Sequence, residues 1–186
     1  MLDVQQLGAY IDARFHAAGH VLFRLESLPA YDVETDGDDF RRWLDGAAEP
    51  MWSRKQPWLD TLRRERANGQ VSRRVRVLSD PLTDYERYSC EFGYAYNVPA
   101  GEDVRVVRPN EHAMPEGLER TDFWIINDVD AVLMHYDERG RFRGATPAPE
   151  ELDRLRRLRD AVWLVAEPFD RWWARHPELH RRSVIS

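Results

Sequence analysis

Residues 70–79 read QVSRRVRVLS, the clearest β-strand pattern in the chain. Side chains alternate across a strand, so this pattern predicts two different faces. One face carries Val71, Arg73, Val75 and Val77. The other face carries Arg74 and Arg76. We therefore predict a central strand over residues 71–78.

A helix and a second strand follow. Aromatic residues recur three to four positions apart over residues 85–96, and residues 104–107 read VRVV. Asp80 is expected to cap the helix, because aspartate is favoured at this position. A strand–helix–strand unit of this kind is normally parallel and right-handed. Residues 70–108 thus predict a parallel β-α-β core, with strand 71–78 paired to 103–107 and neighbouring a strand at 122–126.

The second half of the chain predicts a β-hairpin. Residues 122–126 and 131–136 are strand-like runs separated by NDVD, and the turn residues there favour a hairpin that extends, with an edge strand, over 122–143. Helical spacing over 3–18 and 152–173 predicts flanking helices, the second interrupted at Pro168.

These patterns predict a single α/β domain over residues 1–186, built on a mixed sheet with a parallel core and flanking helices, and with a frayed tail after residue 177. The chain has 186 residues and a net charge of −6. An acidic chain is poorly suited to direct nucleic-acid binding, which needs a surplus of basic residues. Without a membrane-spanning run or a secretory leader, we expect a cytoplasmic protein. The sequence leaves its oligomeric state open, and a homodimer is one of the possible states.

Lysine and cysteine are scarce. Lys55 is the only lysine among 27 basic residues, and Cys90 is the only cysteine. No glycine-rich phosphate-binding motif precedes Lys55, and a single cysteine forms neither an internal disulfide nor a cysteine-based zinc site. We therefore expect no cofactor and no metal.

The best candidate site follows from position within the predicted sheet. Ligands bind parallel sheets outside the carboxyl ends of the strands. The side chains expected to flank a groove at that edge are Arg76, Tyr85, Glu102, Asp122 and Trp124. The alternative is structural: the arginines pair internally with Glu91, Glu102 or Asp122, while the tryptophan and the tyrosines fill the core.

A second interpretation is catalytic. Asp122, Asp128 and His135 would hold a divalent metal in a hydrolase or nuclease, since carboxylates are good ligands for Mg²⁺. Against this, Asn127, Asp128 and Asp130 are residues favoured in hairpin turns. The catalytic interpretation requires Asp122, Asp128 and His135 to converge in one pocket.

Four segments resemble an actinomycete family of unknown function, which has roughly this length. They are FRRWL (40–44), RVRVLSDPLTDY (74–85), GEDVR (101–105) and DFWIIND (122–128). Members of that family are often encoded beside Xre-type helix-turn-helix regulators. The segment order is also similar to one half of the phospholipase D-like fold, which implies a phospholipase D-like layout. Its catalytic motif, H-x-K-x4-D, is missing here.

The leading hypothesis is therefore a non-catalytic regulatory or accessory module. It would bind a protein partner or a small ligand in the strand-end groove, and the resemblance makes an Xre-type regulator the expected partner. The metal-dependent hydrolase or nuclease is the alternative.

Overall fold

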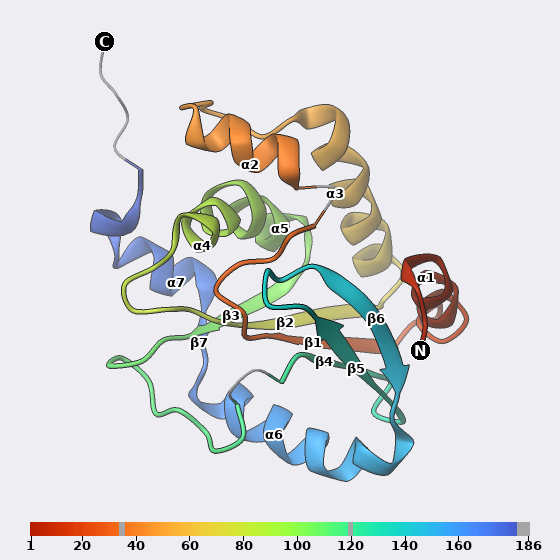
Figure 1. The fold of residues 1–186 in the computed structure, drawn as a ribbon. Coiled ribbons are helices and arrows are strands. Elements are labelled where there is room, and N and C mark those ends of the chain that lie inside the picture. Colours follow the sequence, from red (N-terminus) through yellow and green to blue (C-terminus); the bar gives the residue numbers. More distant parts are fainter. Residues whose placement is uncertain (34–35, 119–120, 182–186) are drawn as a thin grey trace.

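The computed structural model describes residues 1–33, 36–118 and 121–181. Over these residues seven strands form one mixed sheet, in the order β6-β5-β4-β1-β2-β3-β7 (Figure 1). The strands are β1 (Val21–Glu26), β2 (Val71–Val77), β3 (Asp103–Val107), β4 (Phe123–Ile126), β5 (Asp130–Tyr136), β6 (Phe142–Pro147) and β7 (Glu167–Pro168).

The three central strands, β1, β2 and β3, are parallel. The parallel pairing of β2 with β3 confirms the predicted β-α-β core. The outer strands pair antiparallel. The prediction that β2 neighbours the strand at 122–126 is wrong, because β1 lies between them and pairs with both. Strand β1 lies at the centre because a second helical crossover connects β1 to β2 and places these two strands side by side in parallel.

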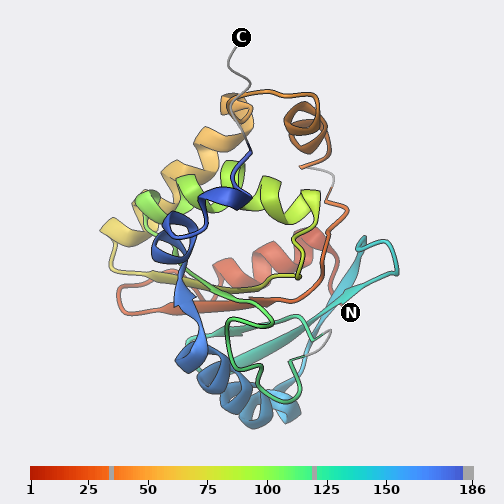
Figure 2. The same cartoon turned by 90° about the vertical axis from the view of Figure 1, so that its left-hand side faces the viewer.

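Helices cover both faces of the sheet (Figures 1 and 2). The α-helices are α1 (Val4–Asp12), α2 (Gly37–Leu44), α3 (Trp52–Ala67), α4 (Asp84–Tyr88), α5 (Ala95–Ala100), α6 (Leu152–Val165) and α7 (Phe169–Ala174). A π-helix, η1 (Ser89–Tyr94), joins α4 to α5, and η2 (Pro149–Glu151) and η3 (Pro177–Leu179) are 3-10 turns. Helix α6 covers one face, and both crossovers, α2–α3 and α4–η1–α5, cover the other.

The crossover helix after β2 begins later than predicted. Its cap is Thr83, whose hydroxyl accepts from the backbone N–H of Glu86 at 3.1 Å, while the Glu86 carboxylate accepts from the backbone N–H of Thr83 at 2.8 Å. This reciprocal capping box satisfies two backbone donors at once, which a single aspartate does not. Asp80 instead binds the side chains of Arg108 and Asn110, both at 2.7 Å.

The hairpin at 122–143 is confirmed. β4 and β5 pair antiparallel around Asn127 and Asp128, which have positive φ angles of 52° and 61°. Asparagine and aspartate tolerate this left-handed conformation, which tight hairpin turns require. β6 follows as the edge strand of the sheet.

The C-terminal region does not form the single helix, interrupted at Pro168, that was predicted over residues 152–173. The chain leaves α6 at Val165, and Glu167 and Pro168 form β7 against β3 before α7 begins. Leu179 is buried, so the chain stays packed beyond the residue where fraying was expected to begin. Residues 182–186 of the expected tail lie outside the described residues.

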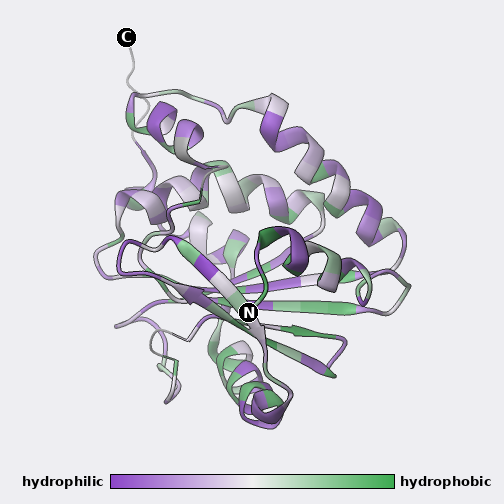
Figure 3. Cartoon of the chain, turned by 45° about the vertical axis from the view of Figure 1, so that its right-hand side comes forward, coloured by the Kyte–Doolittle hydropathy of each residue, from purple (hydrophilic) through white to green (hydrophobic). Residues whose placement is uncertain are grey.

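The two faces of the central strands differ in character. Towards α6 the sheet is largely apolar, and Phe23, Leu25 and Val75 pack there with Leu155 and Val162 of α6. Two arginines of this face, Arg73 and Arg105, lie over the ring of Trp163. Towards the crossovers, the same strands carry charged side chains. In Figure 3 hydrophobic stretches run along several strands, whereas α3 is largely hydrophilic. Within the described residues, none of the helices has the length and apolar character needed to cross a membrane.

Candidate functional site

A cavity of about 470 Å³ lies on the charged side of the sheet, between the ends of β1 and β5 and the two crossovers. This is the edge at which ligands meet parallel sheets. Much of its wall is aromatic, formed by Tyr31, Trp58, Tyr85, Tyr88, Phe92, Tyr94 and Tyr136. Its charged lining consists of Glu26, Asp36, Asp39, Arg54, Lys55 and Arg74.

Arg74 forms the floor of the cavity on β2. Its Nε and Nη2 lie 2.9 and 2.8 Å from Glu102 Oε1, and its Nη1 binds Glu26. Burial acts to raise the pKa of Glu26, but Arg74 and Arg76 outweigh it and hold that pKa below its ordinary value. The floor is therefore a charge-compensated network of carboxylates and guanidinium, a geometry in which hydrogen bonds are strong.

Lys55 reaches the cavity from α3. Its Nζ donates to the carbonyl oxygen of Gly93 at 3.2 Å and to Oδ1 of Asn97 at 2.8 Å. Gly93 belongs to the π-helix, a helix type that is frequent at functional sites. Burial lowers the pKa of Lys55 to about 8, because it disfavours the charged form.

Two hydrogen-bonded tyrosine–aspartate pairs lie at the cavity wall. The Tyr85 hydroxyl donates to Asp36 Oδ2 at 2.8 Å, and burial raises the pKa of both groups. The Tyr31 hydroxyl donates to Asp122, which also accepts from the backbone N–H and hydroxyl of Ser27 at 2.8 and 2.6 Å. Burial raises the pKa of Asp122 as well. These hydrogen bonds fix the orientation of both tyrosine rings.

The structure places one of the five predicted groove residues on the cavity wall. That residue is Tyr85. Glu102 and Asp122 lie directly behind the wall, where they bind Arg74 and Tyr31. Both are buried, with exposed fractions of 2% and 5%. The expected pairing of an arginine on this strand with Glu102 is thus confirmed, for Arg74.

Neither Arg76 nor Trp124 lines the cavity. Arg76 is fully buried, with Nη1 3.5 Å from the Tyr31 hydroxyl and Nη2 3.9 Å from Glu86. Its Nε and Nη2 have no hydrogen-bond partner in the described structure. Trp124 packs under the guanidinium of Arg24, 4.8 Å from the ring centre, and with apolar residues of α1. Only Arg76 supports the wall, through its contact with Tyr31.

Sequence reasoning missed most of the wall. Lys55 stood out as the only lysine, but no pattern placed α3 over the strand ends. Tyr31 and Tyr136 follow or end strands at the same edge of the sheet. Their contribution depends on β1 being central, which the sequence pattern did not indicate.

The residues of the hydrolase alternative do not converge. Asp122 precedes β4 and Asp128 follows it, so the strand holds them roughly 15–20 Å apart at about 3.3 Å per residue. Asp128 is a turn residue that pairs with Arg156 and Arg159. His135 Nε2 lies 2.9 Å from the Thr146 hydroxyl. Over residues 1–33, 36–118 and 121–181, no group of three histidine, cysteine or acidic residues is arranged to hold a metal.

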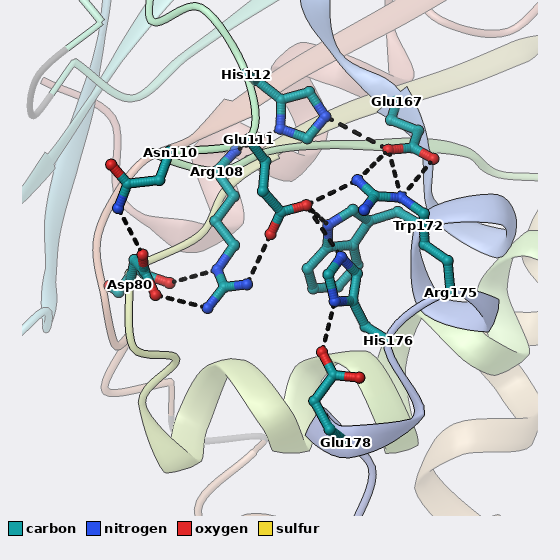
Figure 4. A network of polar contacts seen from close by, with 11 residues as sticks. Asp80, Arg108, Asn110, Glu111, His112, Glu167, Trp172, Arg175, His176 and Glu178 are labelled. Carbon is teal, nitrogen blue, oxygen red and sulfur yellow. Dashed lines mark hydrogen bonds and ion pairs between the residues drawn. The ribbon is translucent and has the colours of Figure 1, made fainter.

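A second polar network lies away from the cavity and joins the loop after β3 to the C-terminal region (Figure 4). Glu111 is its centre. Its carboxylate accepts from Arg108 at 2.6 Å, Arg175 at 2.7 Å, and Trp172 and His176 at 3.0 Å. Partial burial opposes ionisation, but these hydrogen bonds lower the pKa of Glu111 to about 2. The network fastens α7 to the sheet.

The fold and the cavity define an α/β protein with a mixed sheet and an aromatic strand-end pocket roofed by two crossovers. The family model of a domain of unknown function, DUF6879, matches residues 9–174, and the chain belongs to that family. Comparisons with curated proteins and with solved structures gave no match.

Proposed function

We propose that this chain is a non-catalytic regulatory module that binds a small molecule in the strand-end cavity. The aromatic wall is the observation that carries the proposal. A volume of about 470 Å³ lies within the range of small-molecule sites. Such sites combine apolar and aromatic walls with a few fixed polar groups, and this cavity has both.

The organisation of the polar groups supports binding. Arg74 is held by Glu26 and Glu102. Tyr85 is held by Asp36 at 2.8 Å. Side chains fixed in this way lose little conformational freedom when a ligand enters, which favours affinity. In the same arrangement the carboxylates are already occupied as hydrogen-bond acceptors, which suits recognition better than proton transfer.

The regulatory part of the proposal rests on the resemblance to actinomycete proteins encoded beside Xre-type regulators. We propose that such a regulator responds to the occupied cavity. Helices α2 and α3 contribute Asp39 and Lys55 to the wall and also face outwards, so a ligand there is able to alter the surface seen by a partner.

The test is a cavity-filling variant with a matched control. Gly93 lines the cavity and has open space where a Cβ would stand, as does Gly8 on α1, which is outside the cavity. Purified wild-type protein, Gly93→Phe and Gly8→Phe would be screened against a metabolite collection by ligand-observed NMR. Compounds that bind wild type and Gly8→Phe but not a folded Gly93→Phe are expected. Binding that is equal in both variants, or no binding to wild type, would refute the proposal.

A further inference from the structure

Lys55 differs from the other two cations of the cavity wall. Arg74 contacts Glu26, and Arg54 pairs with Asp38 at 2.9 Å. These charges are compensated at contact distance. Lys55 has only neutral acceptors, a backbone carbonyl and an amide oxygen.

An ammonium group has three N–H donors. Two of those of Lys55 are used, at Gly93 and Asn97, so one remains without an acceptor in the described structure. Over the same residues, the contacts of Lys55 Nζ are these two, and no ion pair joins it to a carboxylate. A partly buried cation without a contacting anion is costly, and an anion that enters the cavity relieves that cost.

More distant charges decide which anion fits. Asp36 and Asp39 face the lysine from α2, Glu102 faces it from the start of β3, and Arg74 faces it from β2. Glu102 is already bound by Arg74 and Asn97. With two aspartates in the wall, a second negative charge on the ligand would be repelled. Because Arg54 and Arg74 already contact Asp38 and Glu26, Lys55 is left to bind one negative charge.

We propose that the ligand is an aromatic monocarboxylate, with its carboxylate bound to Lys55 Nζ and its ring among the tyrosines of the wall. This inference rests on the proposed function and narrows it to one ligand class. Aromatic rings pack favourably against tyrosine faces and edges. A charge-assisted hydrogen bond to the carboxylate then fixes the orientation of the ligand.

The pH dependence of binding follows from the same contact. In the empty cavity the pKa of Lys55 is about 8, lowered first by burial and by Arg74, and raised by the three carboxylates. A bound carboxylate stabilises the protonated amine. Affinity is thus constant from about pH 6 to pH 8, where the ligand carboxylate and the amine are both ionised, and falls about tenfold per pH unit above pH 8, until the pKa of the complex is reached.

The test compares three ligands of similar shape. Binding of 3-phenylpropanoate, 3-phenylpropanamide and 2-phenylethylamine to the full chain would be measured by titration with NMR detection. We expect the carboxylate to bind at least about tenfold more tightly than the amide or the amine. The inference would be overturned if the amide or the amine bound wild type as tightly as the carboxylate and failed to bind Gly93→Phe. The proposed function would then still stand. If none of the three binds, the inference fails, and the metabolite screen decides the proposed function separately.

Lys55→Met removes the cation and keeps the length of the side chain, and Arg63→Met, on the same helix but outside the cavity lining, is the matched control. The tenfold preference should vanish in the first variant and persist in the second. Should Lys55→Met not fold, wild-type protein still gives an answer. Reductive ¹³C-methylation labels its only lysine, and the pKa read from that resonance should rise when 3-phenylpropanoate binds. An unchanged pKa would refute the contact.

Discussion

The two faces of the central strands are covered by helices but carry different kinds of side chain. Towards α6, Phe23, Leu25 and Val75 form a continuous apolar core. Towards the crossovers, the strands present Arg74 and Arg76 in the same alternating pattern. Alternation by itself therefore does not reveal which face is buried.

The charged face is stable because carboxylates arrive from neighbouring strands. Glu26 from β1 and Glu102 at the start of β3 flank Arg74 on either side. Such pairs contribute little net stability compared with apolar packing, but the loss of one partner leaves a buried charge. A charged sheet face therefore stabilises the fold less than an apolar face does, but it places polar groups next to the cavity. The comparison can be tested by substitutions on each face.

The largest effect is expected on the apolar face. Val75→Asp places a carboxylate where the valine is fully buried in the apolar cluster against α6. We expect a loss of about 4 kcal/mol in the free energy of unfolding, measured by urea denaturation. Val75→Ile is the control and should remain within about 1.5 kcal/mol. A Val75→Asp protein as stable as wild type would show that this face is not the core.

On the charged face, Glu102→Gln should cost about 2–3 kcal/mol. The amide keeps the shape of the side chain but removes the charge that faces Arg74 at 2.8 Å. The loss in the double variant with Arg74→Met should be smaller than the sum of the two single losses, measured in the same denaturation experiment, which distinguishes a charge pair from simple packing. Additive losses in the double variant would contradict the pairing.

A carboxylate network nearer to the surface gives an intermediate case. The pKa of Glu111 is about 2, below its ordinary value of 4.5, because of its four donors. The folded state therefore gains stability from the ionised group above pH 4.5, and loses that gain as the pH falls from 4.5 towards 2. Glu111→Gln should cost about 1–2 kcal/mol at pH 7 and much less near pH 2, by thermal unfolding at both values. A cost that does not change with pH would exclude the network as its origin.

The smallest effect is expected in the hairpin turn. Asp128 is exposed and pairs with Arg156 and Arg159. Exposed ion pairs contribute little, and asparagine also tolerates the positive φ at this position. Asp128→Asn should change stability by less than about 1 kcal/mol and leave ligand binding unchanged. A larger effect on binding would revive a functional role for this residue.

Local patterns predicted much of the secondary structure from sequence. The alternation at 70–79, the aromatic crossover and the hairpin turn at Asn127 and Asp128 are all found in the structure. Each depends on neighbours within a few residues, where backbone preferences and side-chain periodicity act directly. The start of the crossover helix was misplaced because Asp80 and Thr83 are both good caps, and only Thr83 has Glu86 three residues later.

The cavity was decided only by the tertiary structure. The sequence determined that a strand carries Arg74 and Arg76 on one face, and that a single lysine stands at position 55. It did not determine that β1 occupies the centre, that Glu26 and Glu102 flank Arg74, or that Lys55 reaches Gly93 and Asn97. These contacts join residues 28 to 48 positions apart along the chain. The packing of two crossovers on one sheet face brings them together, and no periodicity within a single segment encodes that arrangement.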